Sequence, residues 1–456
     1  MMKNRIATQL TLTLLAVCLA SPALATDGVL EINQTCADST GCFSGDAPGL
    51  PVTIDGSAGR SYRLTSDLTV PDENTDGISI STNDVGIDLN NFAITGPVTC
   101  SPAIGSVICA PLAGTGVGIR GVEYTFGTCC EGISVKNGSI SGMGYAGIAL
   151  GFVSEVRNVR ARRNAQCGIC VWPGSTVSDN VVFLNGLVGI VAGEHSTILR
   201  NTSNYNGGTG INSWGGATIA GNTATHNYSH GIHATTSNNM PPPVTTEGAT
   251  ISGNLATYNG GSGIKVEATD SSATVIGNNA SSNTVDGIST GHGATVSNNT
   301  ANANGEDGIE SLTGSTVKGN TTRVNTGNGI KTGANSTVIE NSASENGERG
   351  ISTGSGSTLI ANTAFNNDAE GIHVGGYGST VKNNSTRSNG SDGITVAGNG
   401  SNIRDSTSRD NGGYGLNISG STESGYGGNV FSNNSLGHVN GGTQLGENLC
   451  GGSICP

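Results

Sequence analysis

Charged and aromatic residues are scarce in this 456-residue chain. Only 12% of its residues are charged and 4% are aromatic, and Trp occurs twice. The low charge content excludes a solvated, disordered polyelectrolyte, and the low aromatic content excludes a core built on large rings. The 20 basic residues are outnumbered by 33 acidic ones, so the formal net charge is −13. Because binding to duplex nucleic acid needs a basic face, no nucleic-acid partner is expected.

Long apolar runs are also missing after residue 25, where no run reaches the ~18 residues that span a bilayer. We therefore expect no transmembrane segment. Residues 1–25 have the form of an export signal, with Lys3 and Arg5 before the apolar run Leu10–Leu19 and the small residues Ala23 and Ala25 at its end. The expected location is periplasmic or extracellular.

Ten cysteines follow this leader, and an even number in an exported chain favours disulfides. The motif Cys167-x-x-Cys170 has the spacing of half a zinc or redox site, but no second such motif accompanies it. We favour disulfides for these two cysteines also, with Cys129 and Cys130 as candidate partners, and expect no metal site. The predicted disulfide cysteines, whose pairing stays open, are Cys36, Cys42, Cys100, Cys109, Cys129, Cys130, Cys167, Cys170, Cys450 and Cys455.

Glycine, by contrast, is abundant, with 74 residues and no collagen triplet. A Gly-aliphatic pair recurs mostly every 21 or 22 residues, a period typical of a solenoid. The residue after the glycine is Ile twelve times, then Leu416 and finally His438, so this column is predicted to face inward. The repeat glycines are Gly147, Gly168, Gly189, Gly210, Gly231, Gly263, Gly287, Gly308, Gly329, Gly350, Gly371, Gly393, Gly415 and Gly437.

Asparagine stands four residues before almost every repeat glycine. Asn tolerates left-handed backbone, and stacked Asn amides can bond to one another, so this column predicts an asparagine ladder. The predicted ladder runs through Asn164, Asn185, Asn206, Asn227, Asn259, Asn283, Asn304, Asn325, Asn346, Asn367, Asn389, Asn411 and Asn433.

Two further columns repeat with the same period. One has Val or Ile after Thr, and the other has small residues such as Ala301. Together with the Gly-aliphatic column they predict three short β-strands per coil. No stretch has the 3.6-residue period of a helix. The fold class predicted is all-β, a parallel β-solenoid of 21–22-residue coils with disulfide-stapled ends. Its predicted parts are an N-terminal cap with irregular coils (26–115), a regular body (116–435) with an inserted loop near 235–248, and a C-terminal cap (436–456).

The pattern N-x-x-x-G-I, with T-V-x-x-N about eight residues later, resembles the right-handed parallel β-helix repeat of the pectin-lyase-like superfamily. The resemblance covers most of the chain and implies a right-handed, single-stranded β-helix. It is unspecific for function, because this superfamily includes polysaccharide lyases, hydrolases, epimerases, phage tailspikes and adhesins.

Motifs of the characterised enzymes in that superfamily are incomplete here. The segment Asn74–Gly77 matches the NTDG motif of polygalacturonases and Gly291–Gly293 matches their GHG motif, but the two are over 200 residues apart. The Asp-Asp pair expected between them is missing, as is the D-P-H-D motif of alginate epimerases. No calcium motif is present, so calcium is not assigned, although stacked carboxylates such as Asp286 and Asp307 have the residue type for it.

The strongest irregularity is the 32-residue step between Gly231 and Gly263, which contains Met240-Pro-Pro-Pro243. Function concentrates on such insertions. Two residues after those glycines stand His233 and Lys265, predicted to stack on adjacent coils roughly 5 Å apart. A neutral His beside a Lys supplies a base and a positive charge for removing the C5 proton of a uronic acid, so both are candidate catalytic residues of a lyase or epimerase.

Aromatic and polar residues near this pair are candidate sugar-binding groups. Two Trp fall in one column, two coils or roughly 10 Å apart, and a second aromatic column lies on successive coils. Two functions stay open: an exported protein that binds or processes polysaccharide, and a non-catalytic extracellular binding or structural rod. The candidate substrate-binding residues are Trp172, Tyr205, Trp214, His226, His230, Tyr258 and Glu267.

Overall fold

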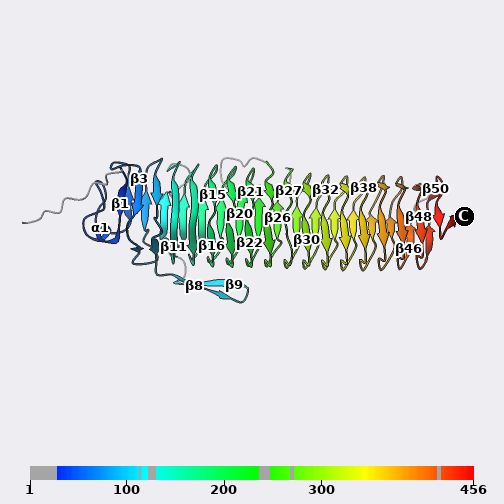
Figure 1. The fold of residues 1–456 in the computed structure, drawn as a ribbon, viewed down its shortest axis with the longest axis horizontal. Coiled ribbons are helices and arrows are strands. Elements are labelled where there is room, and N and C mark those ends of the chain that lie inside the picture. The colour runs from blue at the N-terminus through cyan, green and yellow to red at the C-terminus, as the bar shows by residue number, and fades with distance from the viewer. Residues whose placement is uncertain are drawn as a thin grey trace, which may run out of the picture.

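A computed structural model describes residues 28–111, 114–121, 130–235, 247–267, 272–418 and 423–455. The predicted leader, Cys129 and the Pro-rich part of the inserted loop lie outside these residues. Within them the chain forms one long rod of stacked coils (Figure 1). The described part contains one helix, the short α1 (Gln34–Ser39), and no helix there is long and apolar enough to cross a membrane.

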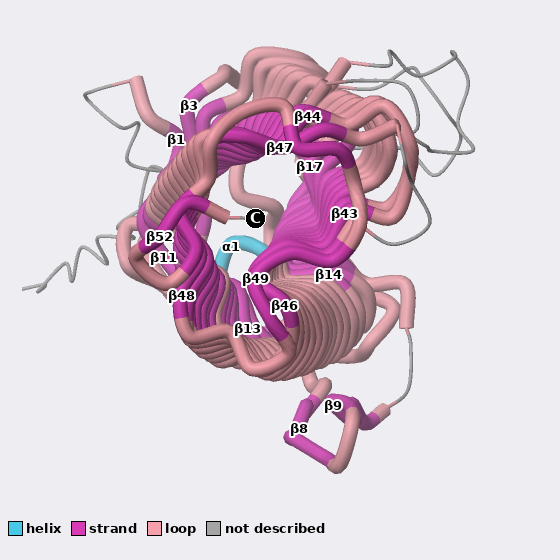
Figure 2. Tube along the Cα trace, turned by 90° about the vertical axis from the view of Figure 1, so that its right-hand side faces the viewer, coloured by secondary structure: helices cyan, strands magenta, loops and turns pink. Residues whose placement is uncertain are grey.

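Each regular coil consists of three short strands separated by turns. One coil contains β31 (Ile309–Ser311), β32 (Thr316–Lys318) and β33 (Thr321–Arg323). The next coil repeats them as β34 (Ile330–Thr332), β35 (Thr337–Ile339) and β36 (Ser342–Ser344), each parallel to its predecessor. We name the three resulting sheets the GI, TV and TA sheets after the residues that begin their strands. Seen end-on, they enclose a narrow interior (Figure 2).

The GI sheet carries the candidate site. Its strands follow the repeat glycines, and their register is continuous along the rod. The sheet begins with β2 (Val52–Ile54) and β5 (Ile78–Ile80) and continues with β10 (Val117–Gly121), β12 (Ala146–Leu150), β14 (Cys167–Val171), β17 (Ile190–Ala192), β20 (Ile211–Trp214), β23 (Ile232–Thr235), β26 (Ile264–Glu267), β28 (Ile288–Thr290), β31, β34, β37 (Ile351–Thr353), β40 (Ile372–Val374), β43 (Ile394–Val396), β46 (Tyr414–Asn417) and β49 (Gly437–Asn440).

The core is a column of small and medium aliphatic side chains. In the coil of β31, Ile309, Val317 and Ala301 of the preceding TA strand are fully buried, and equivalent residues of the other coils join them in one cluster. Burying a Val or Ile side chain contributes about 1.5–3 kcal/mol. Larger rings are buried in this core near the ends of the rod, at Tyr62, Tyr426 and Phe431. The predicted inward-facing columns are therefore confirmed up to the last coil.

Two asparagine ladders hold successive coils together. Asn304 illustrates the pattern: its amide nitrogen Nδ2 donates to Asn325 Oδ1 at 2.9 Å and to the backbone oxygen of Ala280 at 3.1 Å. The backbone amide of Asn304 also donates to Asn325 Oδ1, at 3.0 Å. The second ladder, between the TV and TA sheets, has the same geometry at Asn299 and Asn320. Buried Asn side chains thus satisfy one another and the turn backbone.

The last coil corrects two predicted positions. Leu416 pairs with Val439, not with His438, and the ladder passes from Asn411 to Asn434, not to Asn433. This coil is one residue longer than its predecessor, which the alignment on Gly437 concealed. Asn434 is buried and Val439 packs against the core, so burial of suitable side chains sets the register here.

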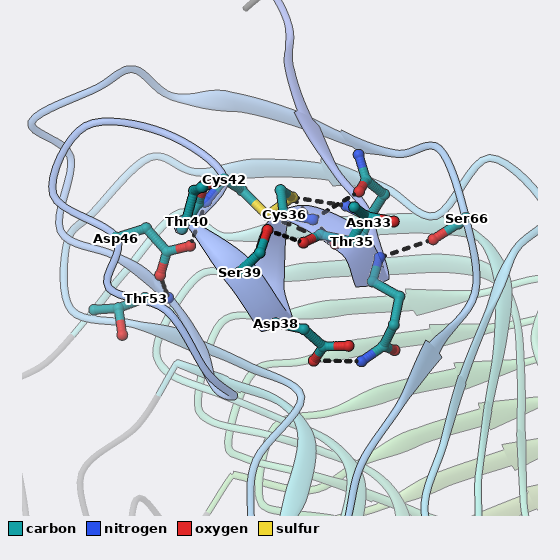
Figure 3. Close-up of a disulfide and its surroundings, with 12 residues drawn as sticks. Asn33, Thr35, Cys36, Asp38, Ser39, Thr40, Cys42, Asp46, Thr53 and Ser66 are labelled. Atoms are coloured by element: carbon teal, nitrogen blue, oxygen red, sulfur yellow. Dashed lines mark hydrogen bonds between the residues drawn. A yellow bond between two sulfur atoms is a disulfide. The ribbon is translucent and has the colours of Figure 1, made fainter.

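Disulfides close both ends of the rod, as predicted. At the N-terminus Cys36 bonds to Cys42 beside α1, whose Ala37 is buried in the core (Figure 3). At the other end β51 (Leu449–Cys450) and β52 (Ser453–Ile454) form an antiparallel pair joined by Cys450–Cys455. These contacts cover the ends of a stack that otherwise exposes its core and its unpaired strands.

A hairpin of β8 (Thr99–Ala103) and β9 (Ser106–Ala110) lies beside the rod (Figures 1 and 2). The Cys100–Cys109 disulfide joins its strands, and its apolar side packs against Ala165 and Leu184 at the turns before the GI sheet. The hydroxyl of Tyr228 donates to the backbone oxygen of Ala103 at 2.8 Å, which fixes the hairpin tip.

Candidate functional site

The repeat glycine brings two outward side chains together on each coil. Cys167 pairs with Ala146 and Ile169 with Ile148, so Gly168 between them stands opposite Gly147 of the preceding coil. The residue just before each glycine and the residue two after it are neighbours outside the main core. Most residues at the first position are buried, as Asp286 and Asp307 are, and most at the second are half-buried. We call these residues, from Ala146 and Ala149 to Tyr414 and Asn417, the outer double row.

This geometry corrects the predicted pairing of Cys167 and Cys170. They occupy the two double-row positions of one coil and bond to each other, with Cα atoms 6.3 Å apart. Neither therefore bonds to Cys129 or Cys130, and the zinc interpretation of the motif fails with it. Cys130 is itself disulfide-bonded.

His233, Lys265 and Glu267 meet on adjacent coils of the GI sheet. His233 pairs in register with Lys265, which confirms their predicted stacking. Lys265 Nζ lies 2.6 Å from Glu267 Oε1, and His233 Nε2 lies 3.5 Å from Glu267 Oε2. Burial lowers the pKa of His233, while the hydrogen bond from Lys265 lowers that of Glu267. The cluster thus contains a neutral imidazole beside an ion pair.

His230 shares the double row with His233, and their ring centroids are 5.3 Å apart. Its Nδ1 accepts a hydrogen bond of 3.0 Å from the backbone amide of Ser262 on the next coil. Burial, reinforced by the nearby His233 and Lys265 side chains, lowers the pKa of His230 to about 4. The neutral imidazole of His230 therefore links two coils through one of its ring nitrogens. Its role in substrate binding stays a prediction.

The two tryptophans lie on the same sheet, N-terminal to the histidines. Their ring centroids are 6.3 Å apart, nearer than the roughly 10 Å expected from two coils. The coil between them has Gly193 in this column, where a Cβ atom would lie 2.7 Å from the carbonyl carbon of Trp172. The rings of Trp172 and Trp214 therefore approach over a glycine, and Phe152 extends the row at 5.6 Å from Trp172.

The second aromatic column is a continuous stack at the turn before the GI sheet. Tyr205 and His226 stack at 4.7 Å between ring centroids, and His226 and Tyr258 at 5.1 Å. These rings cover one another's faces, so the middle ring is available mainly at its edge. Tyr258 at the end of the stack is 60% exposed.

Sequence reasoning missed the neighbour relationship across each glycine and therefore a second polar cluster. Arg349 Nε lies 2.9 Å from Glu370 Oε2, and His373 Nδ1 lies 3.7 Å from Glu370 Oε1. The spacing of Cys167 and Cys170 could have indicated this relationship. A disulfide between these two cysteines requires that the residue before the glycine and the residue two after it be neighbours.

The stacked carboxylates Asp286 and Asp307, considered above for calcium, occupy the double row, and both are buried. Asp286 Oδ1 accepts from the backbone amide of Asp307 at 3.1 Å, and Asp307 Oδ1 accepts from that of Asn328 at 2.6 Å. They thus hold the next coil in the way that His230 does. Among the described residues, no group of three or more His, Cys, Asp or Glu side chains is placed to hold a metal ion.

Asp286 gives a pH-dependent prediction. Burial, with the nearby negative charge of Glu310, raises its pKa to about 7. Since the native pKa exceeds the unfolded value of about 3.9, the folded protein binds more protons between these values and loses stability as the pH rises through them. Asp286→Asn keeps an oxygen for the amide of Asp307 and should raise stability by about 2 kcal/mol at pH 8 but little at pH 4.

Thermal unfolding at both pH values measures this effect. Asp368→Asn removes an exposed carboxylate from another column and serves as the matched control. An equal gain for Asp286→Asn at pH 4 and pH 8 would contradict the assigned cause.

Fold and site together define a right-handed parallel β-helix with a polar outer row on one sheet. The chain belongs to the right-handed beta helix region family, whose model matches residues 66–244, 243–343 and 330–448. No match was found among curated proteins.

Several solved structures are similar to this chain at low sequence identity. A mutant of the periplasmic alginate epimerase AlgG is 14% identical, covers 64% of this chain and 77% of its own, and has a TM-score of 0.37. The AlgE6 A-module of the mannuronan C-5 epimerase of Azotobacter vinelandii is 12% identical, with coverages of 94% and 89% and a TM-score of 0.23. The tailspike of E. coli bacteriophage HK620, solved with a pentasaccharide, is 12% identical, with coverages of 92% and 80% and a TM-score of 0.48.

Proposed function

We propose that this protein is exported and binds an extracellular or periplasmic polysaccharide on the GI sheet between β14 and β26. The observation that carries the proposal is the alignment of Trp172, Trp214, His233, Lys265 and Glu267 on one face of consecutive coils. Aromatic faces pack against sugar rings, and the charged groups bond to hydroxyls or carboxylates. Disulfides accord with export.

The chemistry that this site supports best is proton abstraction from a uronic acid. His233 is held neutral by burial, as a general base must be, and lies beside the positive charge of Lys265. Transfer of the C5 proton to His233 would leave negative charge on the sugar carboxylate, which Lys265 would stabilise. If the C4–O bond then breaks and the leaving oxygen takes the proton from His233, a C4=C5 double bond forms and the protein is a lyase. If C5 instead takes a proton from water on its opposite face, the protein is an epimerase.

A screen of acidic and neutral glycans tests this function. The protein would be incubated with alginate, polygalacturonate, chondroitin sulfate and dextran, with and without calcium. Ultraviolet absorbance would detect new unsaturated ends, and proton NMR would detect epimerised units. We expect activity on one uronate polymer, reduced about 10²–10⁴-fold in His233→Asn because the general base is lost.

The repeat itself supplies variants compatible with the fold. Asn212 occupies the position of His233 one coil earlier, and Ser289 that of Lys265 one coil later, so His233→Asn and Lys265→Ser are the matched changes. His292→Ala, at an exposed turn, is the control and should leave activity unchanged. Full activity in both site variants would remove them from the mechanism.

A second function, a non-catalytic binding rod, is favoured by one observation. Each cation of the outer double row from β26 onward has a carboxylate partner: Lys265 with Glu267, Lys331 with Glu310, and Arg349 with Glu370. Neutralised cations suit recognition of sugar hydroxyls better than capture of an acidic group. Binding of a glycan without any product on any polymer would establish this function instead.

A further inference from the structure

The outer double row carries a second cluster that the proposed site does not use. Arg349, Glu370 and His373 lie on two adjacent coils, with an Arg349 Nε–Glu370 Oε2 distance of 2.9 Å. The side chains of Glu370 and His373 are only 17% and 19% exposed. Contact with His373, together with Arg349, lowers the pKa of Glu370 to about 2, so its carboxylate is charged.

The fold does not require these residues. Ser352 and Thr395 occupy the position of His373 on the coils before and after it, and Asn328 precedes Arg349 in the column of Glu370. Partly burying an imidazole and a carboxylate costs solvation free energy that Ser or Thr would avoid. His373 Nδ1, at 3.7 Å from Glu370 Oε1, is too far for a hydrogen bond and lacks a hydrogen-bond partner within the described structure.

The cluster lies in exact register with the candidate site. Successive strand pairs connect His233 to His373 in six steps through double-row positions that hold only polar side chains. At the usual strand spacing the two histidines are about 29 Å apart along the rod axis. The intervening positions are Lys265, Ser289, Glu310, Lys331 and Ser352.

The composition of the cluster suits neighbouring sugar hydroxyls. A guanidinium offers donors in a fixed fork, a carboxylate accepts, and an imidazole does either, so together they match groups that both donate and accept hydrogen bonds. A sugar unit in an extended polymer is about as long as the coil spacing, so such a chain can follow the row coil by coil.

We propose that Arg349, Glu370 and His373 form a second subsite for the same polysaccharide, whose chain lies along the rod axis from the tryptophans to β40. This rests on the proposed function. A chain long enough to occupy both subsites binds more tightly than a short one, because its second contact is intramolecular.

Tryptophan fluorescence reports binding at the first subsite selectively, because the chain has two tryptophans and both lie there. Tryptophan fluorescence would be titrated with tri- and decasaccharides of mannuronate and of β-1,3-glucan. For the sugar that binds, we expect the decasaccharide to half-saturate the wild-type protein at a concentration about tenfold or more below the trisaccharide.

The variants His373→Ser and Glu370→Asn introduce the residues that occupy the same positions on nearby coils, so both are compatible with the fold. Each should abolish the advantage of the decasaccharide and leave the trisaccharide titration unchanged. Arg323→Ala, which breaks the exposed Arg323–Glu345 pair on another sheet, is the matched control and should change neither titration.

The outcomes separate the two proposals. A decasaccharide advantage that survives both variants, or no advantage at all, overturns the second subsite and leaves polysaccharide binding in place. If calorimetry with both sugars and both lengths also detects no binding, the proposed function fails, and the subsite fails with it.

Discussion

Asn367→Ala should destabilise the rod by about 3–6 kcal/mol. Asn367 Oδ1 accepts from the backbone amide of Asn346 at 3.1 Å and from its Nδ2 at 2.9 Å, while Asn367 Nδ2 donates to Asn389 Oδ1 at 2.9 Å. The side chain is buried, so water cannot replace these partners. Alanine leaves donors of the preceding coil unsatisfied, at about 1–3 kcal/mol each.

The adjacent residue provides the control. Asn366 is exposed, and Ala303 occupies its left-handed position three coils earlier, so Asn366→Ala should lie within about 1 kcal/mol of wild type. Guanidinium unfolding followed by far-UV circular dichroism would compare both variants. Similar midpoints for the two would show that the ladder bonds contribute little net stability.

Gly308→Ala should lower the free energy of unfolding by about 3 kcal/mol, as overpacking of a core does. A Cβ atom at Gly308 would lie 2.6 Å from Asn325 Nδ2 and 2.6 Å from the backbone oxygen of Gly329. Neither can move freely, because both belong to the next coil. The methyl group would therefore force adjacent coils apart, and unfolding would spread to neighbours that depend on this interface.

Gly314, on the same coil, separates steric from conformational effects. Its φ is +75°, and a Cβ atom there would have nothing within 4 Å. Gly314→Ala should cost only about 1 kcal/mol, the usual penalty of a left-handed non-glycine residue. The same unfolding measurement applies, and a larger loss for Gly314→Ala than for Gly308→Ala would refute the close-packing argument.

The periodicity of Gly, Ile and Asn was sufficient to predict the solenoid, because each column has one physical role repeated on every coil. The predicted register was wrong in the last coil, which is one residue longer than the coil before it. The repeat was aligned on Gly437, whereas the burial of Asn434 and Val439 sets the actual register. Glycine identity alone therefore did not determine which residue fills the core.

The candidate site was predicted in part. The stacking of His233 on Lys265 follows directly from the repeat period, and the structure has it. The close approach of Trp172 and Trp214 depends on Gly193, and the proximity of Glu370 to His373 depends on the repeat glycine Gly371 between them. Both are three-dimensional effects of a glycine that has no Cβ atom, which a one-dimensional alignment does not show.

The outer double row also bears on how such a protein changes over evolutionary time. Its two positions per coil lie outside the core and outside both ladders, and they accept residues as different as Cys, Val, His, Asp and Arg. Substitutions several coils apart share no partners, so their effects should add. Substitutions in the double row can therefore change the binding specificity of this face one coil at a time, without a change in the core residues that stabilise the fold.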